Sequence, residues 1–149
     1  MVERGARNWA IEQGKYGASP VYVFMYSRVH PYIPGVTIAD QDIATIGAYH
    51  TSDVPYWFGT QDALNLIRPT RNWTPSDREL SKQMTDALIA FAKTGDPNTA
   101  AVHWPKWTPQ SEQLVEFGDT IKVQPMNTQR LNFMASHGAA QATPRAARD

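Results

Sequence analysis

The sequence predicts an α/β fold in which a parallel strand lies buried between layers of helix. Residues 20–27 form a continuous apolar run, which is typical of a strand buried on both faces of a sheet. A helix is expected just before it, over residues 3–14, and a helix followed by a buried strand is the repeating unit of parallel α/β sheets. No second run of this kind occurs, so we expect the sheet to be incomplete on its own. The predicted helix places four residues on one face: Ala6, Trp9, Ala10 and Gln13.

The clearest local signal is an amphipathic helix over residues 75–93. Thr74 is the expected N-cap, Pro75 suits the first helical position, and Asp77 completes a capping box. Gly95 is expected to end the helix in the left-handed conformation. The apolar residues at helical spacing, which we expect to face the core, are Leu80, Met84, Ala87, Leu88, Phe91 and Ala92.

A β-hairpin is expected near the end of the chain. Its strands cover residues 114–117 and 120–123, and Gly118 and Asp119 form a two-residue turn between them. The earlier segment 60–72 is expected to be partly helical. Its packing residues are Leu64, Leu66 and Ile67.

The remaining parts after the long helix are a linker and a C-terminal extension. Trp104 and Trp107 are expected to hold the linker against the domain. Residues 128–134 are expected to form one or two helical turns. From residue 136 to 149 the sequence is alanine-rich and charged without periodicity, so we expect a disordered tail there.

Composition excludes several functional classes. The chain has 149 residues, enough for one modest domain, and its net charge is zero, so neither nucleic acid nor an anionic membrane is an expected partner. The absence of cysteine excludes disulfides, thiolate metal sites and a cysteine nucleophile. No apolar run approaches the roughly 20 residues of a membrane span, and the N-terminus lacks the apolar region of a signal peptide.

The chemistry of the sequence centres on His50. This residue lies in a turn that begins at Gly47 and precedes the aromatic run at 56–58. An imidazole is the side chain best suited to proton transfer near neutral pH. A long irregular connection over residues 29–47 delivers it from the end of the predicted strand, where open α/β sheets place their chemistry. A histidine with a purely structural role would give the same local pattern.

Three sequence motifs, the first of which contains His50, follow one another along the chain. They are Gly47-Ala48-Tyr49-His50 with Asp53, Pro55 and Tyr56-Trp57-Phe58-Gly59, then residues 91–98 (FAKTGDPN), then residues 104–109 (WPKWTP) with 115–119 (VEFGD). Over about positions 5 to 134 they resemble the type-B carboxylesterases, the cholinesterase-like branch of the α/β-hydrolase family. The resemblance implies that residues 1–135 are the C-terminal portion of an α/β-hydrolase fold, from a serine esterase that hydrolyses carboxylic esters.

The resemblance also implies a role for His50, as general base for a serine and then general acid for the leaving alcohol. In this fold the serine sits in a Gly-x-Ser-x-Gly elbow, and none of the seven serines here has that context. The family places both nucleophile and orienting carboxylate upstream, so we expect the chain alone to be inactive. No cofactor is expected. A small carboxylic ester would be the substrate once an upstream segment completes the site.

Other polar residues near His50 have ordinary local interpretations. Ser52 is expected to make a hydrogen bond within its turn, and Asp53 to cap the next turn. A metal site built from His50 and His103 has no supporting ligand spacing. The residues that receive no catalytic role are Asp40, Asp42, His30, His103 and His137.

Two alternatives stay open. The aromatic residues 56–58 either line an acyl or alcohol pocket or pack in the core, and we expect core packing because three adjacent rings cannot all face one cavity. The cholinesterase-like family also includes non-catalytic members, so the chain could instead be a binding module. Self-association through an exposed sheet edge would then be expected.

Overall fold

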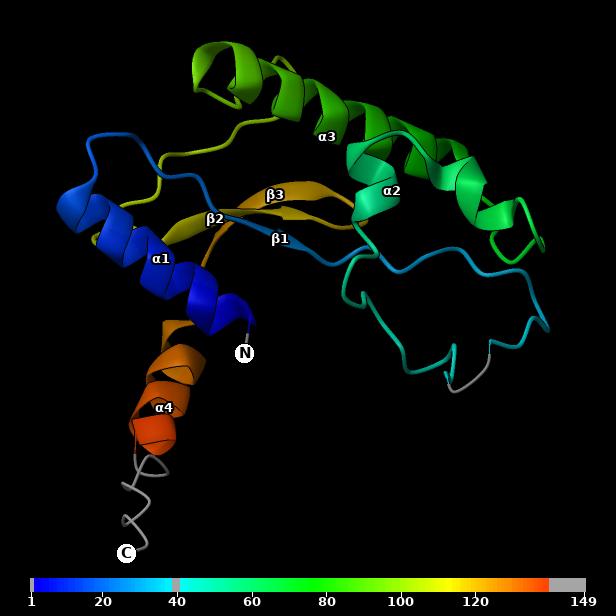
Figure 1. Ribbon diagram of the computed structural model, residues 1–149, viewed down its shortest axis with the longest axis horizontal. Coiled ribbons are helices and arrows are strands. Elements are labelled where there is room, and N and C mark those ends of the chain that lie inside the picture. Colours follow the sequence, from blue (N-terminus) through cyan, green and yellow to red (C-terminus); the bar gives the residue numbers. More distant parts are fainter. Residues whose placement is uncertain (1, 39–40, 140–149) are drawn as a thin grey trace, which may run out of the picture.

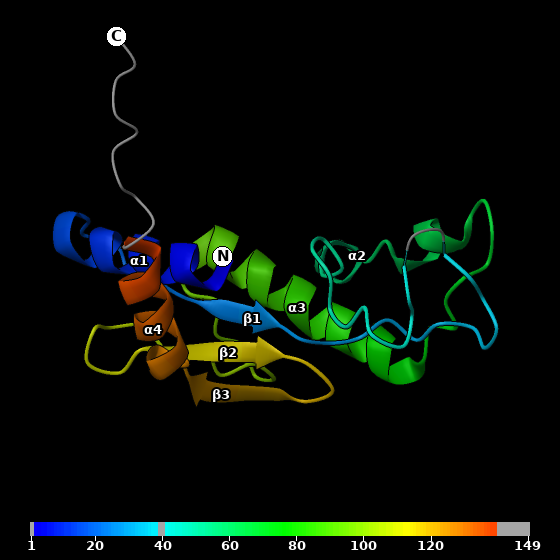
Figure 2. The same ribbon diagram turned by 90° about the horizontal axis from the view of Figure 1, so that it is seen from below.

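The structure is a computed structural model that describes residues 2–38 and 41–139. A three-stranded sheet in the order β1-β2-β3 lies between helices: α3 covers one face, and α1 and α4 lie on the other (Figures 1 and 2). Strand β1 runs parallel to β2, and β2 runs antiparallel to β3. The elements are α1 (Val2–Tyr16), β1 (Phe24–Tyr26), α2 (Val54–Trp57), η1 (Gln61–Asn65), α3 (Pro75–Thr94), β2 (Gln113–Phe117), β3 (Ile121–Pro125) and α4 (Thr128–Ala139).

Strand β1 is shorter and more exposed than the sequence predicts. Only Phe24–Tyr26 pair as a strand, with β2 on one side, and no other described residue pairs with the opposite edge. Phe24 is exposed because it borders a surface groove that no described element covers. The prediction of a strand over residues 20–27 buried on both faces is therefore wrong in both length and burial.

Each face of the sheet has its own core, because side chains alternate along a strand. Val115 and Phe117 of β2 face α3, whereas Leu114 faces α1 and α4. The core under α3 is Tyr56, Leu80, Met84, Ala87, Val102, Trp104, Val115 and Phe117. The core under α1 and α4 is Ala10, Val23, Trp107, Leu114, Met126 and Leu131.

The two linker tryptophans hold the chain against the segment that leads into β1, as predicted. Trp104 is buried on the α3 side, where its indole N–H donates to the Val23 carbonyl at 3.0 Å. Trp107 is buried on the other side, and its backbone N–H donates to the Val21 carbonyl at 2.8 Å. The linker thus contributes a side chain to both cores.

Helix α3 begins at Pro75, as the sequence predicts, and ends at Thr94, one residue later than predicted. Thr74 and Asp77 form the capping box, and Gly95 ends the helix with φ 77°. Its apolar face is buried only in part: Leu80, Met84 and Ala87 face the core. Three residues predicted to be in the core are exposed, since they lie on the side of the helix that no described element covers: Leu88, Phe91 and Ala92.

Several other boundaries differ from prediction. The hairpin turn has three residues, 118–120, because Phe117 pairs with Ile121. Helix α4 continues through residue 139, beyond the point where the tail was expected to begin, and the rest of that tail, residues 140–149, lies outside the described residues.

Side-chain burial also departs from prediction in two segments. The residues that were expected to pack but are exposed are Trp9 and Gln13 in α1, and Leu64, Leu66 and Ile67 after α2. Apolar spacing alone does not say which residues a neighbouring element covers. Within residues 2–38 and 41–139, no helix is long and apolar enough to cross a bilayer.

Candidate active site

His50 lies at the corner of a tight turn formed by residues 49–52. The backbone N–H of Ser52 donates to the Tyr49 carbonyl at 3.0 Å, and the Ser52 hydroxyl donates to the same carbonyl at 2.6 Å. This is the local turn bond that the sequence predicts for Ser52. Thr51 has φ 69°, a left-handed conformation that is unusual for a β-branched residue. His50 itself is exposed, and no hydrogen bond to its imidazole occurs among the described residues.

The turn belongs to the loop that leaves the carboxyl end of β1. In both views this loop extends beyond the sheet, on the side away from α1, before the chain enters α2 (Figures 1 and 2). Gly47 and Gly59, with φ 59° and 61°, lie on either side of the turn and α2. Placement at the carboxyl end of a parallel strand is usual for the chemistry of open α/β sheets.

The carboxylates near His50 in sequence are engaged elsewhere. Asp42 accepts hydrogen bonds from the Ala44 backbone at 3.0 Å and from the Thr45 hydroxyl at 3.1 Å. Asp53 occupies the N-cap position of α2 without a capping bond from its side chain, which corrects the prediction. Its carboxylate accepts from the Trp57 indole N–H at 3.1 Å instead. Asp40 lies outside the described residues.

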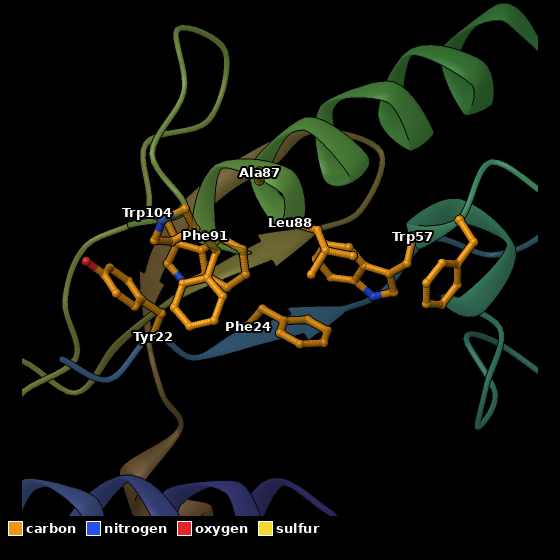
Figure 3. Close-up of a pocket in the computed structure, with 9 residues that line it drawn as sticks. Tyr22, Phe24, Trp57, Ala87, Leu88, Phe91 and Trp104 are labelled. Atoms are coloured by element: carbon orange, nitrogen blue, oxygen red, sulfur yellow. The ribbon is translucent and has the colours of Figure 1, made fainter. Parts of the chain in front are cut away.

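The aromatic run after the turn divides between core and groove. Tyr56 is buried, as predicted, but Trp57 and Phe58 line an apolar hollow of about 350 Å³ between β1, α2 and α3. Phe58 is 65% exposed, so the expectation of core packing is wrong for it. Figure 3 shows the labelled rings of Phe24, Trp57 and Phe91 from these elements gathered around this space, together with those of Tyr22 and Trp104. The residues that line the hollow, here called the apolar groove, are Tyr22, Phe24, Trp57, Phe58, Ala87, Leu88, Phe91, Pro97 and Trp104.

A buried ionic junction, which sequence reasoning missed beyond its capping box, joins the end of β1 to α2 and α3. Asp77 is fully buried and accepts from Arg28 Nε at 2.8 Å, from the Tyr56 hydroxyl at 2.8 Å and from the Thr74 backbone at 2.9 Å. Burial alone would raise the pKa of Asp77, but the hydrogen bonds from Arg28, Thr74 and Tyr56 outweigh burial and hold this pKa below its ordinary value. Asp77 is therefore a buried carboxylate that keeps its charge.

His30, to which the sequence assigned no role, contacts both sides of the His50 turn. It is buried, with its Nε2 atom 2.8 Å from the Ser52 carbonyl and its Nδ1 atom 3.4 Å from the Tyr49 hydroxyl. Burial lowers the pKa of His30 more than its hydrogen bond to Ser52 raises it. No local sequence pattern predicts this contact, because Ser52 is 22 positions away from His30 in the chain.

The other two histidines lie away from the turn. His103 is exposed in the linker, and His137 stacks on Phe133 within α4 at a ring-centroid distance of 4.0 Å. In the described part of the chain, no three side chains of the His, Asp or Glu type come together as a metal site would require.

Several solved structures similar to this one are esterases. A para-nitrobenzyl (PNB) esterase superposes with a TM-score of 0.69 at 27% identity, covering 87% of this chain and 24% of that one. An esterase from Clostridium hathewayi, described as able to hydrolyse aliphatic aromatic polyesters, superposes with a TM-score of 0.67 at 25% identity, covering 88% and 23%. The sheet, helices and connecting loop described above are thus part of an α/β-hydrolase fold.

Comparison with related sequences identifies the protein family within this fold. The carboxylesterase family model matches residues 2–134, so the chain belongs to the carboxylesterase family. The para-nitrobenzyl esterase of Bacillus subtilis (strain 168) is 31% identical over 137 residues, which are 91% of this chain and 25% of the relative. The bile salt-activated lipase of Homo sapiens is 34% identical over 94 residues, 60% of this chain and 12% of the relative. The chain thus spans about a quarter or less of the length of these relatives.

Proposed function

We propose that this chain contributes the catalytic histidine, His50, of a serine esterase that hydrolyses carboxylic esters. The observation that carries the proposal is the exposed imidazole of His50, presented by a closed turn beyond the carboxyl end of β1 in a chain of the carboxylesterase family. Relatives described as esterases and a lipase support an ester as the substrate.

In this role His50 handles one proton in each half of the reaction. Its imidazole takes the proton of the serine hydroxyl as that oxygen attacks the ester carbonyl carbon. It then gives the proton to the alcohol oxygen as the ester C–O bond breaks. In the second half, His50 takes a proton from the water that attacks the acyl carbonyl carbon, and it gives that proton to the serine oxygen as the bond between this oxygen and the acyl carbon breaks, which releases the carboxylic acid and the free serine.

The nucleophile in this proposal comes from sequence outside these 149 residues. None of the seven serines lies in a Gly-x-Ser-x-Gly elbow. Five of their hydroxyls already bond to groups of the fold: Ser27 to Glu116, Ser52 to the Tyr49 carbonyl, Ser81 to the Tyr56 carbonyl, Ser111 to the Thr108 hydroxyl and Ser136 to the Phe133 carbonyl. The orienting carboxylate is assigned to outside sequence as well, since Asp42 and Asp53 have other partners.

A fluorophosphonate probe tests the missing nucleophile. Such probes react covalently with activated serines, so the chain alone is expected to remain unlabelled. Labelling of any serine in this chain would overturn the proposal. Mapping the labelled residue by mass spectrometry would then identify the nucleophile directly.

A chimera tests His50 itself. This chain would replace the matching quarter of the Bacillus subtilis para-nitrobenzyl esterase, and the product would be assayed with a nitrophenyl ester. His50→Gln is expected to lower kcat by roughly 10⁴-fold or more, as loss of a triad histidine does. His103→Gln, a change in the exposed linker, is the matched control. A folded, active chimera that keeps its kcat after His50→Gln would contradict the role.

The free edge of β1 and the apolar groove favour a second function, association. Phe58 and Phe91 are exposed there, and no described strand pairs with the outer edge of β1. We propose that a second copy of the chain covers this surface when nothing else does. Analytical ultracentrifugation should show concentration-dependent dimers that Phe91→Glu abolishes and Ile67→Glu, outside the groove, does not. A stable monomer at all concentrations would remove this candidate.

A further inference from the structure

We propose that His30 is the positioning residue of the His50 turn: its imidazole joins the Tyr49 hydroxyl to the Ser52 carbonyl and so holds His50 in place. The inference rests on the role proposed for His50. It concerns a geometry, however, that can be measured without any hydrolysis.

The hydrogen positions in this chain of groups follow from its two ends. Arg71 Nη2 lies 3.1 Å from the Tyr49 hydroxyl, and a guanidinium only donates, so the hydroxyl accepts there and has its own hydrogen free for His30 Nδ1. At the other end the Ser52 carbonyl only accepts, so His30 Nε2, at 2.8 Å, must carry a hydrogen. His30 is therefore the neutral tautomer with its hydrogen on Nε2.

The surroundings of His30 favour this neutral form. The side chain is 3% exposed and is packed by four aromatic rings, those of Tyr32, Tyr49, Tyr56 and Trp73. The charged groups that act on it are Arg71 and Arg28, which oppose protonation, and Asp77, which favours it. Protonation would add a hydrogen on Nδ1 that points at a hydroxyl already receiving one from Arg71. In the neutral ring, Nδ1 accepts from the Tyr49 hydroxyl and Nε2 donates to the Ser52 carbonyl.

The bridge closes a ring of contacts around the turn. His30 connects the side chain of Tyr49 to the carbonyl of Ser52, and Ser52 returns to the Tyr49 carbonyl through both its backbone N–H and its hydroxyl. His50 and Thr51 are the two residues left between the anchored positions. The strained φ of Thr51 persists only where the surroundings enforce it, and this ring supplies that constraint.

The start of the loop is anchored too, so His30 is a fixed support. The backbone N–H of Asn72 donates to the Pro31 carbonyl at 2.7 Å, and Tyr32 pairs with Arg71 in an isolated bridge. Loops are ordinarily mobile, whereas a displacement of about 1 Å in a reacting group can lower a rate by about 10²-fold. Holding both flanks of His50 against an anchored histidine is a physical solution to that conflict.

Two substitutions at His30 separate hydrogen bonding from packing. His30→Phe keeps a ring among the aromatic neighbours but removes both hydrogen bonds. His30→Gln keeps a donor near the position of Nε2 and an acceptor beside it. His103→Phe, in the exposed linker, is the matched control for the loss of a histidine.

The measurement is NMR on the whole 149-residue chain. In the unsubstituted chain, ¹⁵N shifts should show His30 protonated on Nε2 and not on Nδ1 at neutral pH. Amide exchange at Ser52, whose N–H closes the turn, should accelerate at least about tenfold in His30→Phe, return close to the original rate in His30→Gln, and stay unchanged in His103→Phe. Amides in the middle of α3 should be unaffected by all three.

Two results would overturn the proposal: a His30 hydrogen on Nδ1, or an unchanged Ser52 exchange rate in a folded His30→Phe chain. If His30→Phe unfolds, the α3 amides will exchange rapidly as well. The test then rests on the His30 tautomer in the unsubstituted chain and on the Ser52 exchange rate in His30→Gln. In a folded, active chimera, His30→Phe should lower kcat with little change in KM, and His30→Gln should restore it. An inactive chimera with the expected NMR results would count against the function and not against the positioning.

Discussion

Asp77 and His30 are both buried beside the carboxyl end of β1, yet Asp77 keeps its charge and His30 does not. Asp77 faces a cation, Arg28, and several donors that bond to its oxygens. His30 faces a carbonyl, a hydroxyl and two arginines, with Asp77 as the one nearby anion that favours its charge. Burial therefore determines the protonation state of His30, whereas hydrogen bonds determine the protonation state of Asp77.

The two groups also hold different parts of the molecule. Asp77 connects Arg28 after β1, Tyr56 of α2 and Thr74 before α3, so it joins the sheet to two helices. His30 connects one end of a loop to the other. We therefore expect damage at Asp77 to lower the stability of the whole domain, and damage at His30 to loosen the turn that carries His50.

The largest expected effect on stability is that of Asp77→Ala. Removing this carboxylate leaves the buried Tyr56 hydroxyl without its acceptor and Arg28 with only the exposed Asp119, and breaking a buried ion pair typically costs about 3–5 kcal/mol. Urea denaturation followed by circular dichroism measures the change. Asp119→Ala is the matched control, since Asp119 pairs with the same arginine but its side chain is 85% exposed, and it should change stability little. Equal effects of the two substitutions would contradict the junction.

The sequence predicted the parts of these sites that are local. The capping box of α3 lies within four residues and was predicted completely, as was the turn bond of Ser52. Arg28 reaches Asp77 from 49 positions away, and His30 reaches Ser52 from 22, so neither pairing leaves a pattern in the sequence.

Exposure was the other property that the sequence could not give. Met84, Leu88 and Phe91 follow one helical period, yet Met84 is in the core and the other two line the apolar groove. Periodicity tells which residues share a face of α3, and a different element decides whether that face is covered. The same reasoning explains β1. Its apolar run predicts a strand with a neighbour on each edge, and among the described residues only β2 pairs with it.

The second prediction uses pH to separate the two groups. Folding lowers the pKa of His30 below 6.5, so between the folded and unfolded values the unfolded chain binds more protons. The contribution of His30 to the free energy of unfolding is complete above pH 6.5 and is lost as the pH falls below that value. The lowered pKa of Asp77 has the same sign, but its loss begins only below 3.8. One proton limits the slope to about 1.36 kcal/mol per pH unit.

Urea titrations at about pH 7 and about pH 5 test this, because Asp77 stays charged at both values. The unsubstituted chain should be less stable at the lower pH, and His30→Gln should remove the part of that loss due to His30. Arg71 and Arg28 remain charged throughout and cannot produce the difference. An identical pH slope in His30→Gln would show that His30 is not a buried neutral group.

The smallest expected effect is that of Thr74→Ala, which removes the capping hydroxyl and leaves Arg28 and Tyr56 on Asp77. Loss of an N-cap side chain typically costs about 1 kcal/mol, whereas Ser76→Ala, two residues further on at an exposed position, should cost much less. The double variant Thr74→Ala with Asp77→Ala should lose less than the sum of the two single costs, because Asp77→Ala already removes the acceptor of the Thr74 hydroxyl while the bond that this hydroxyl accepts from the backbone N–H of residue 77 remains. Strictly additive costs would instead show that the cap works independently of the junction. In that case the charge of Asp77 would be held by Arg28, Tyr56 and the Thr74 backbone N–H, without a contribution from the Thr74 hydroxyl.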